Sequence, residues 1–151
     1  MLFRSIGFPG ETEEDFAHTV SLLREVEYDH AYIFKYSPRP GTDAAAREDD
    51  VPQDVKERRN HLLLQLQDTI AAERHARFIG TVQEILIEGP AKQPGQLFGR
   101  TRGNHGVVLD GPPELIGRTV SVSVTRATPH TIFGVLHDHQ PDCVSRADGC
   151  R

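Results

Sequence analysis

The pentapeptide GFPGE, residues 7–11, has the composition of a ligand-binding turn between a strand and a helix. Glycines at such a turn let a cofactor approach the backbone closely, because no Cβ intervenes. The turn and the start of the following helix also expose backbone N–H groups. The same pattern is equally typical of a turn that only bends the chain. The candidates for cofactor binding are Gly7, Phe8, Pro9, Gly10 and Glu11.

A second candidate is KYSPRPGT, residues 35–42, where two prolines stiffen the end of a short apolar run. In barrels of parallel strands, the carboxyl ends of the strands face the active site. The guanidinium of Arg39 has the geometry to hold a phosphate or a carboxylate through two N–H groups. The residues Lys35, Tyr36 and Arg39 are therefore candidates for positioning a substrate, and an exposed surface loop is the alternative.

Basic residues are spread through the second half of the chain, among glycine-rich turns. Small barrels that bind single-stranded nucleic acid combine a basic groove with side chains on which bases stack. Phe98 is a candidate stacking platform or a core residue. The candidates for RNA binding are Lys92, Arg100, Arg102, Asn104, Arg118 and Arg126, with His105 next to them in a glycine-rich loop.

The sequence contains no recognisable catalytic set. Ser37 and Ser121 lie in no nucleophile-elbow motif, and neither HExxH nor a phosphate-binding loop is present. The two cysteines, Cys143 and Cys150, are separated by six residues, whereas metal sites usually pair cysteines two to four residues apart. A loose polar tail is the favoured interpretation of residues 138–151, and no catalytic or metal site is assigned.

The first half of the chain has the pattern of an α/β segment. Thr12 is a suitable N-cap for a helix over about 13–27, and Asp15 occupies the capping-box position. Residues 31–36 are rich in aromatic residues and predict a short strand. A second helix is expected over about 52–77, with an apolar stripe that comprises Val55, Leu62, Leu63, Leu66, Ile70 and Ala71. Its basic shoulder, Lys56, Arg58, Arg59 and His61, is interpreted as a solvated face, with direct RNA contact as the alternative.

The second half changes character near residues 78–80. Five short β-rich runs separated by glycines and prolines occupy about 60 residues, which predicts a small closed or nearly closed antiparallel barrel. The run VSVSV, residues 120–124, alternates strictly, so that one face can be buried and the other wet. We therefore expect an α+β chain of two parts, at 1–77 and 78–137, followed by a disordered tail at 138–151.

Composition fits a protein outside the membrane. Of the 151 residues, 37% are hydrophobic, and no apolar run approaches the roughly 18 residues of a membrane span. The start of the chain lacks the features of a signal peptide, so a cytoplasmic location is expected. The net charge is −5, yet residues 77–137 carry six Lys and Arg against four Asp and Glu. Only this half has the net positive charge that is typical of a nucleic-acid binder.

The ordered motifs resemble the C-terminal part of the MiaB-type radical-SAM methylthiotransferases. The resemblance covers about residues 7–136 and rests on GFPGETEEDF, YIFKYSPRPGT, VPQDVKERRNHLLLQLQ, GRTRGN and IGRTVSVSVTRA. It implies that residues 1–77 belong to the end of a TIM-like radical-SAM barrel and that residues 78–137 form a TRAM domain, an OB-like RNA-binding barrel. It also implies that GFPGE lies near S-adenosylmethionine.

The resemblance implies S-adenosylmethionine and [4Fe-4S] clusters as cofactors of the family. The cluster-binding cysteines are absent from this sequence, and Cys143 and Cys150 match neither set. Only residues 1–6 precede the turn, with Arg4 and Ser5 where the family has apolar residues. This departure favours a truncated or rearranged copy. Because the cofactors carry the chemistry, the chain alone is expected to be inactive.

Three functions remain open from the sequence. The leading hypothesis is the C-terminal segment of a tRNA methylthiotransferase of the 2-methylthio-N6-dimethylallyladenosine type, which contributes binding of tRNA near the anticodon through the TRAM barrel. A partner chain would then supply the rest of the α/β barrel. The alternatives are a stand-alone TRAM module that binds RNA without catalysis and a non-functional gene fragment.

Overall fold

The computed structural model describes residues 2–137, which divide into two compact units. The first unit runs through Ile79 and also takes in Ala127–Thr131. The second unit consists of Gly80–Arg126 and the chain from Ile132 onward. The expected tail at 138–151 lies outside the described residues. No helix in the described part of the chain combines the length and apolar character that a membrane span requires.

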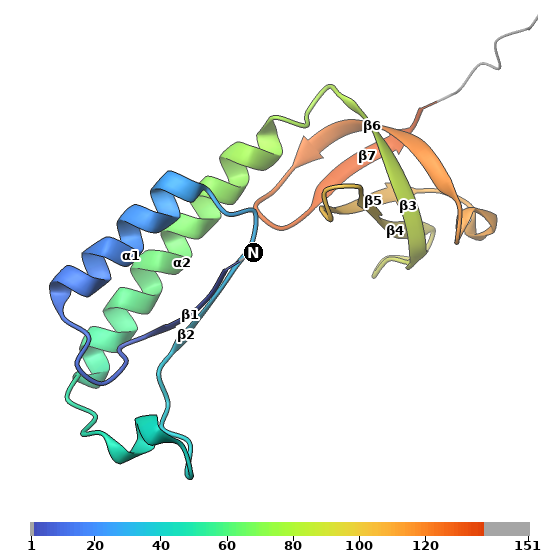
Figure 1. Ribbon diagram of the computed structural model, residues 1–151. Coiled ribbons are helices and arrows are strands. Elements are labelled where there is room, and N and C mark those ends of the chain that lie inside the picture. The colour runs from blue at the N-terminus through green and yellow to red at the C-terminus, as the bar shows by residue number, and fades with distance from the viewer. Residues whose placement is uncertain (1, 138–151) are drawn as a thin grey trace, which may run out of the picture. The chain divides into compact units, whose positions relative to one another are not determined.

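The first unit is a β–α–β–α arrangement (Figure 1). Its elements are β1 (Leu2–Ile6), α1 (Glu13–Val26), β2 (Ala31–Lys35), a short 3-10 helix (Asp43–Ala46) and α2 (Gln53–Ala76). Strands β1 and β2 are parallel and pair in register from Leu2 with Ala31 to Ile6 with Lys35. The expected partial α/β segment is therefore present, with both helices close to their predicted bounds.

Helix α1 begins with the predicted capping box. The Thr12 hydroxyl accepts a hydrogen bond from the Asp15 N–H at 3.1 Å, and the Asp15 carboxylate accepts one from the Thr12 N–H at 3.0 Å. Hydrogen bonds from Thr12 hold the pKa of the Asp15 carboxyl below its usual value. The helix ends at Glu27, whose positive φ of 50° reverses the chain.

The core of this unit lies between the helices and one face of the sheet. It consists of Ile6, Phe16, Leu23, Ile33, Leu63 and Ile70. The opposite face of the sheet exposes aromatic rings, because Phe3, Tyr32 and Phe34 are 64%, 48% and 56% exposed. The rings of Phe3 and Tyr32 stack at 4.9 Å between centroids. One sheet face is therefore uncovered by the described residues.

The buried face of α2 differs from the predicted one. Leu62 is 48% exposed, whereas Lys56 and Arg59 of the predicted basic shoulder are only 2% and 3% exposed. Their spacing explains the difference, because Lys56, Arg59 and Leu63 recur at three and four residues and share one helix face. The interpretation of these two cations as a solvated face was wrong.

The second unit is a closed barrel with the strand order β3-β4-β5-β7-β6. Its elements are β3 (Val82–Pro90), β4 (Gln96–Thr101), β5 (Gly106–Asp110), a 3-10 turn (Pro113–Leu115), β6 (Thr119–Ala127) and β7 (Ile132–Leu136). The expected OB-like barrel is confirmed. Pairs β3–β4, β3–β6 and β4–β5 are antiparallel as predicted, but β5 and β7 are parallel because β6 pairs with β3 rather than β5.

The barrel core is almost entirely aliphatic. Its buried hydrophobic residues are Ile85, Ile87, Leu97, Val107, Leu109, Val122, Val124 and Ile132. Within VSVSV, Val122 and Val124 are buried and the serines are not, as the alternation predicts. Gly99 is required by close packing, since a Cβ there would lie 2.4 Å from the Leu86 carbonyl oxygen. All five strands of the barrel contribute to this core.

Candidate cofactor edge and RNA-binding face

The two predicted N-terminal motifs meet at one edge of the β1–β2 pair. Because the strands are parallel, the turn after β1 and the turn after β2 lie at the same carboxyl edge. The Tyr36 N–H donates to the Ile6 carbonyl at 2.7 Å, and the rings of Phe8 and Tyr36 pack edge to face at 5.3 Å. A depression of about 430 Å³ is lined there by Ser5, Phe8, Phe34, Lys35, Tyr36, Ser37, Arg39, Thr42 and Ala44.

Three backbone donors of the GFPGE turn form hydrogen bonds within the protein. The Gly7 N–H donates to the Glu11 carboxylate at 3.1 Å, and the Gly10 N–H donates to Asp50 at 2.8 Å. The Glu11 N–H closes the turn onto the Phe8 carbonyl at 2.8 Å. A cofactor that used the Gly10 N–H would have to replace the Asp50 carboxylate. Phe8, at 38% exposed, is open to a ligand.

Lys56 fills the space beneath Gly7. A Cβ on Gly7 would lie 2.3 Å from the Lys56 Cγ, and the φ of Gly7 is +73°, a region that favours glycine. The buried ammonium pairs with Asp49 and lies 5.3 Å from the centre of the Tyr36 ring. Gly7 is therefore needed for both its conformation and its lack of a side chain.

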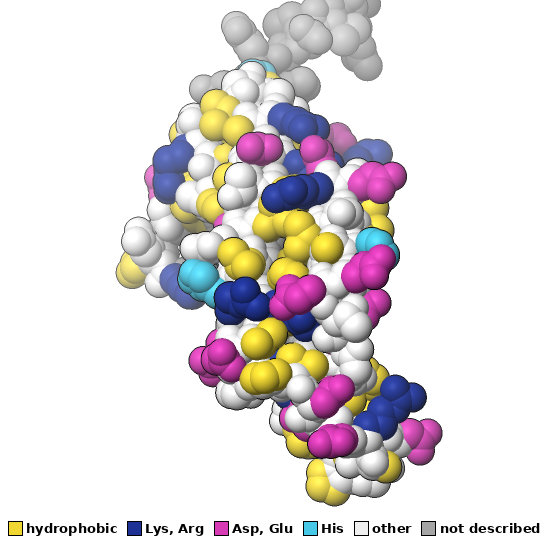
Figure 2. Space-filling model, turned by 90° about the vertical axis from the view of Figure 1, so that its left-hand side faces the viewer, with side chains coloured by type: hydrophobic (Ala, Val, Ile, Leu, Met, Phe, Trp, Pro, Cys, Tyr) yellow, Lys and Arg dark blue, Asp and Glu magenta, His cyan; other side chains and the backbone are white. Residues whose placement is uncertain are grey.

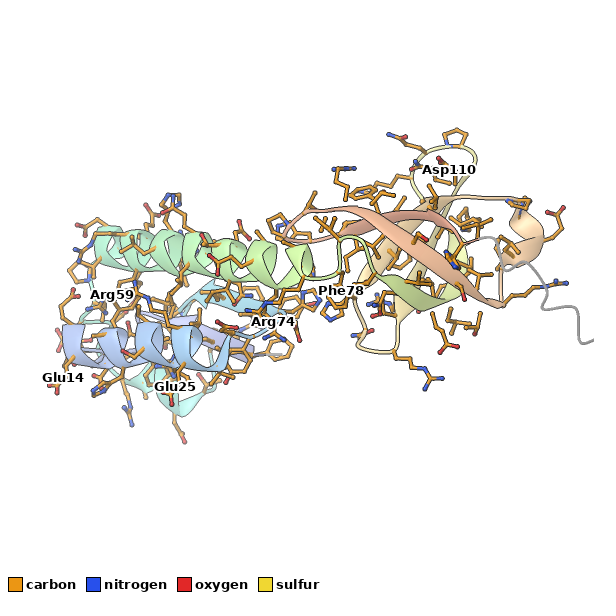
Figure 3. All side chains as sticks on the ribbon, turned by 90° about the horizontal axis from the view of Figure 1, so that it is seen from above. Glu14, Glu25, Arg59, Arg74, Phe78 and Asp110 are labelled. Atoms are coloured by element: carbon orange, nitrogen blue, oxygen red, sulfur yellow. The ribbon has the colours of Figure 1, made fainter. Side chains whose placement is uncertain are left out.

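Arg59 joins α2 to the turn and to the start of α1. Its guanidinium donates to the Glu11 carboxylate at 2.7 Å and to Glu13 at 3.0 Å. The Arg59 and Glu11 side chains are only 4% and 5% exposed. Hydrogen bonding from Arg59 holds the pKa of the Glu13 carboxyl below its usual value. Figure 3 shows Arg59 between the two helices, whereas Glu14 and Glu25 point outward from α1.

The outer helical side of this unit has no patch of one charge sign. Figure 2 shows basic and acidic side chains interspersed with hydrophobic ones over this face. Arg58, the exposed neighbour of Arg59, pairs with Glu13 at 3.1 Å. An RNA backbone needs a surface of net positive potential, so this face is a poor site for it.

The three predicted substrate-positioning residues differ in their contacts. The Lys35 ammonium is paired with Glu57 at 3.0 Å and holds the pKa of the Glu57 carboxyl below its usual value. The buried Tyr36 hydroxyl has no hydrogen-bond partner within the described chain. Arg39 is exposed, and over residues 2–137 its guanidinium forms no salt bridge. Arg39 is thus the exposed group available to a ligand in the depression, whereas the Tyr36 hydroxyl is buried beneath its surface.

The described residues do not fit an iron–sulfur cluster. Such clusters are held by cysteine thiolates, and Cys143 and Cys150 lie outside the described part of the chain. Over residues 2–137, no three His, Cys, Asp or Glu side chains gather as a metal site requires.

On the barrel, three of the predicted RNA-binding residues line one depression. Arg100, Arg102 and Asn104 lie there with Glu84 and Glu88 of β3 among the other lining residues. Arg100 pairs with Glu88 at 3.2 Å and Arg102 pairs with Glu84 at 3.0 Å. Arg100 also donates to the Asn104 side chain at 3.1 Å. Such exposed pairs are weak, so phosphates can compete for these arginines.

The other three predicted cations lie outside that depression. Lys92, Arg118 and Arg126 are exposed, and they form no salt bridge within the part of the chain that the structure describes. The Arg126 guanidinium lies 3.7 Å from the centre of the Phe133 ring, and that of Arg100 lies 5.4 Å from the Phe98 ring. The sequence analysis did not name Phe133 as a candidate RNA-binding residue. Its neighbour Ile132 is buried, and because side chains alternate along a strand, the Phe133 ring faces outward.

Comparisons with known proteins match this architecture. The family model for the TRAM domain matches residues 76–136. The chain is related to the C-terminal, TRAM-bearing part of the MiaB-type methylthiotransferases. The resemblance seen in the sequence is thereby confirmed. The matched residues include the whole barrel from β3 to β7.

Three curated relatives are all named tRNA-2-methylthio-N(6)-dimethylallyladenosine synthase. The protein from Opitutus terrae is 50% identical over 131 residues, which is 87% of this chain and 27% of the relative. Those from Akkermansia muciniphila and Aquifex aeolicus are each 44% identical over 131 residues, covering 86% and 87% of this chain and 29% of each relative. The chain thus spans less than a third of the length of these relatives.

Proposed function

We propose that this chain contributes RNA binding to a tRNA methylthiotransferase and that its TRAM barrel makes the contacts. The observation that carries the proposal is the TRAM match over a barrel whose exposed cations include three without an ion pair in the described part of the chain, Lys92, Arg118 and Arg126. Phosphate contacts dominate the affinity of proteins for nucleic acids, so unpaired cations are the first expected contacts. The RNA proposed is tRNA near the anticodon, which implies a cytoplasmic location.

The salt dependence of tRNA binding tests this proposal. Each phosphate contact steepens the dependence of affinity on salt, because counterions are released. Replacing Lys92, Arg118 and Arg126 together by alanine is expected to weaken tRNA binding and to reduce the slope of log affinity against log salt by about 2. An unchanged slope and affinity in the triple variant would remove these cations from the RNA face.

We also propose that the carboxyl edge of β1–β2 belongs to the cofactor and substrate side of a larger barrel. In this proposal the turn 7–11 lies beside S-adenosylmethionine, and Lys35, Tyr36 and Arg39 position the substrate. The supporting observations are the meeting of the two motifs in one depression and the exposed aromatic face at Phe3, Tyr32 and Phe34. Further strands, from a partner chain in the present hypothesis, would cover that face.

We also propose that the chain has two domains, the end of the α/β barrel at 1–77 and the TRAM barrel at 78–137. The structural units meet between Ile79 and Gly80, and the segment Ala127–Thr131 groups with the first unit. Within that unit, the His75 ring nitrogen Nδ1 lies 2.7 Å from the Thr128 carbonyl oxygen. The β6–β7 connection thus belongs to the first unit, although its flanking strands belong to the barrel.

The competing function is a TRAM module that binds RNA without catalysis. The closed ring of barrel strands favours it, because these strands pair with one another without any strand of the first unit. Purified chain reconstituted with iron and sulfide, then incubated with S-adenosylmethionine and tRNA, separates the hypotheses. We expect tRNA binding without methylthio transfer by this chain alone. Formation of the methylthio nucleoside would contradict its predicted inactivity, and absence of binding would leave the non-functional fragment.

A further inference from the structure

The outer surface of the barrel carries two aromatic rings, each with an arginine placed over it. We infer that Phe98 with Arg100, and Phe133 with Arg126, are two base-stacking positions and that the RNA they hold is unpaired. This inference rests on the proposed RNA binding by the barrel and names the kind of RNA that this face accepts.

The register of three neighbouring strands puts the two rings in one row. Phe98 of β4 is opposite Val108 of β5, and Val108 is opposite Phe133 of β7. The sequence neighbours Leu97, Leu109 and Ile132 are buried in the core, whereas Phe98, Val108 and Phe133 are only half-buried. Because side chains alternate along a strand, the row faces outward.

Each ring has the surroundings of a stacking platform. The Arg126 guanidinium lies 3.7 Å from the centre of the Phe133 ring, which is direct stacking distance. Phe98 lies against Gly106 of β5, where a Cβ would be 3.0 Å from its ring, and Arg100 lies 5.4 Å from its centre. Unpaired RNA bases stack on aromatic rings and on arginine planes, and the same arginines attract phosphate.

The spacing of the two rings excludes a regular helix as the ligand. Two inter-strand distances of about 4.8 Å separate their backbone positions by roughly 10 Å. Consecutive bases in a helix lie only about 3.4 Å apart and are covered by their neighbours. Bases on both rings must therefore be splayed from one another, which only an unpaired strand or loop allows.

The charges along the row are unequal. At the β4 end, Arg100 is paired with Glu88, and a phosphate that binds there must compete with this carboxylate. At the β7 end, Arg126 forms no salt bridge within the described residues. The Phe133 position is therefore the stronger of the two in this inference, and the Phe98 position is the weaker.

Fluorescence anisotropy of the full 151-residue chain tests the inference with a labelled, unstructured 12-nucleotide RNA and the duplex of the same sequence. The variants are Phe133→Leu and Phe98→Leu, which keep an apolar side chain but remove the aromatic face. Leu62→Ala is the control, because Leu62 is an exposed apolar side chain of α2 in the other unit and lies in neither proposed site. Circular dichroism melts verify that each variant folds, and Phe133→Tyr restores an aromatic face.

We expect Phe133→Leu to weaken single-strand binding about tenfold and Phe98→Leu to weaken it less, since one stacked base contributes on that scale. Phe133→Tyr and Leu62→Ala should bind as the parent chain does, and the duplex should bind more weakly than the single strand. Equal binding of duplex and single strand, or wild-type affinity in both leucine variants, overturns the stacking row. Failure of the parent chain to bind either RNA at low salt overturns the proposed function itself.

Discussion

The two units of this protein use their cations in opposite ways. In the first unit, Lys56 and Arg59 are almost completely buried and connect α2 to Asp49, to the GFPGE turn and to the start of α1. In the barrel, the core is aliphatic and the arginines lie outside, over aromatic rings or in weak surface pairs. Buried basic side chains are thus structural elements in the first unit, whereas the exposed arginines of the barrel are potential ligand contacts.

The units also differ in closure. The barrel strands form a closed ring of pairs, whereas β1 and β2 pair only with one another within the described residues. Unpaired edges and uncovered aromatic faces are sites for further protein. Inside the first unit, the ion pairs of buried Arg59 connect α2 to the turn and to the start of α1, whereas the ion pairs of the barrel residues Arg100 and Arg102 are exposed.

The largest effect is expected from removing the partner of a buried cation. Among the described residues, Glu11→Ala leaves the exposed Glu13 as the one carboxylate partner of buried Arg59, and breaking a buried pair typically costs about 3 kcal/mol or more. Urea unfolding followed by circular dichroism at 222 nm, where α1 and α2 dominate, measures the loss. Arg58→Ala is the control and should cost less than about 1 kcal/mol, because its pair is exposed. Equal losses in the two variants would contradict the structural role of Arg59.

Gly7→Ala is expected to cause the next largest loss of folding stability. The new Cβ would both strain a positive φ and collide with the Lys56 side chain, for a loss of about 3 kcal/mol. Gly10→Ala separates these causes, because Gly10 also has a positive φ, of +84°, but has nothing within 4 Å of a Cβ. Strain alone should cost about 1–2 kcal/mol there. If Gly7→Ala proves no worse than Gly10→Ala in the same urea experiment, the Lys56 contact is not required.

A smaller effect is expected from acid. The pKa values of Glu13, Asp15 and Glu57 are all lowered in the folded first unit from reference values of 4.5, 3.8 and 4.5. Their stabilisation is therefore complete above those reference values and is lost as the pH falls through the lower folded pKa values. The midpoint temperature of thermal unfolding, followed at 222 nm, should decrease as the pH is lowered from 5 to 3. Asp15→Asn should reduce this acid sensitivity, and an unchanged pH profile in that variant would rule out the capping box as a cause.

Much of this organisation was readable from the sequence. The capping box, the short parallel strands and the VSVSV alternation each rest on local chemistry, and the structure bears them out. The burial of Lys56 and Arg59 was not predicted, because it depends on where Glu11, Asp49 and Gly7 lie in the folded unit. A helical pattern that counts only apolar residues does not predict that a lysine and an arginine lie on the buried face.

The RNA-binding residues show the same limit. Five basic residues and one asparagine were assigned to RNA binding from the sequence. Of these six residues, Arg100, Arg102 and Asn104 line one depression in the structure, and the other three do not. The pairing of Arg100 with Glu88 and of Arg102 with Glu84 depends on the β3–β4 register, in which Leu86 lies opposite Arg100. The row of Phe98, Val108 and Phe133 depends on the parallel β5–β7 pair, which an all-antiparallel barrel would not contain.

The central claim is that RNA binds to the barrel rather than to α2 of the first unit. Two single arginine variants, measured with tRNA, test this claim most directly. Arg126→Ala removes an exposed arginine of the barrel, and Arg58→Ala removes an exposed arginine of α2. Binding of tRNA by each full-length variant is compared with the parent over a range of salt concentrations. We predict that Arg126→Ala weakens binding and lowers the salt slope by about 1, while Arg58→Ala changes neither. Loss of affinity in Arg58→Ala with none in Arg126→Ala would contradict the placement of RNA on the barrel.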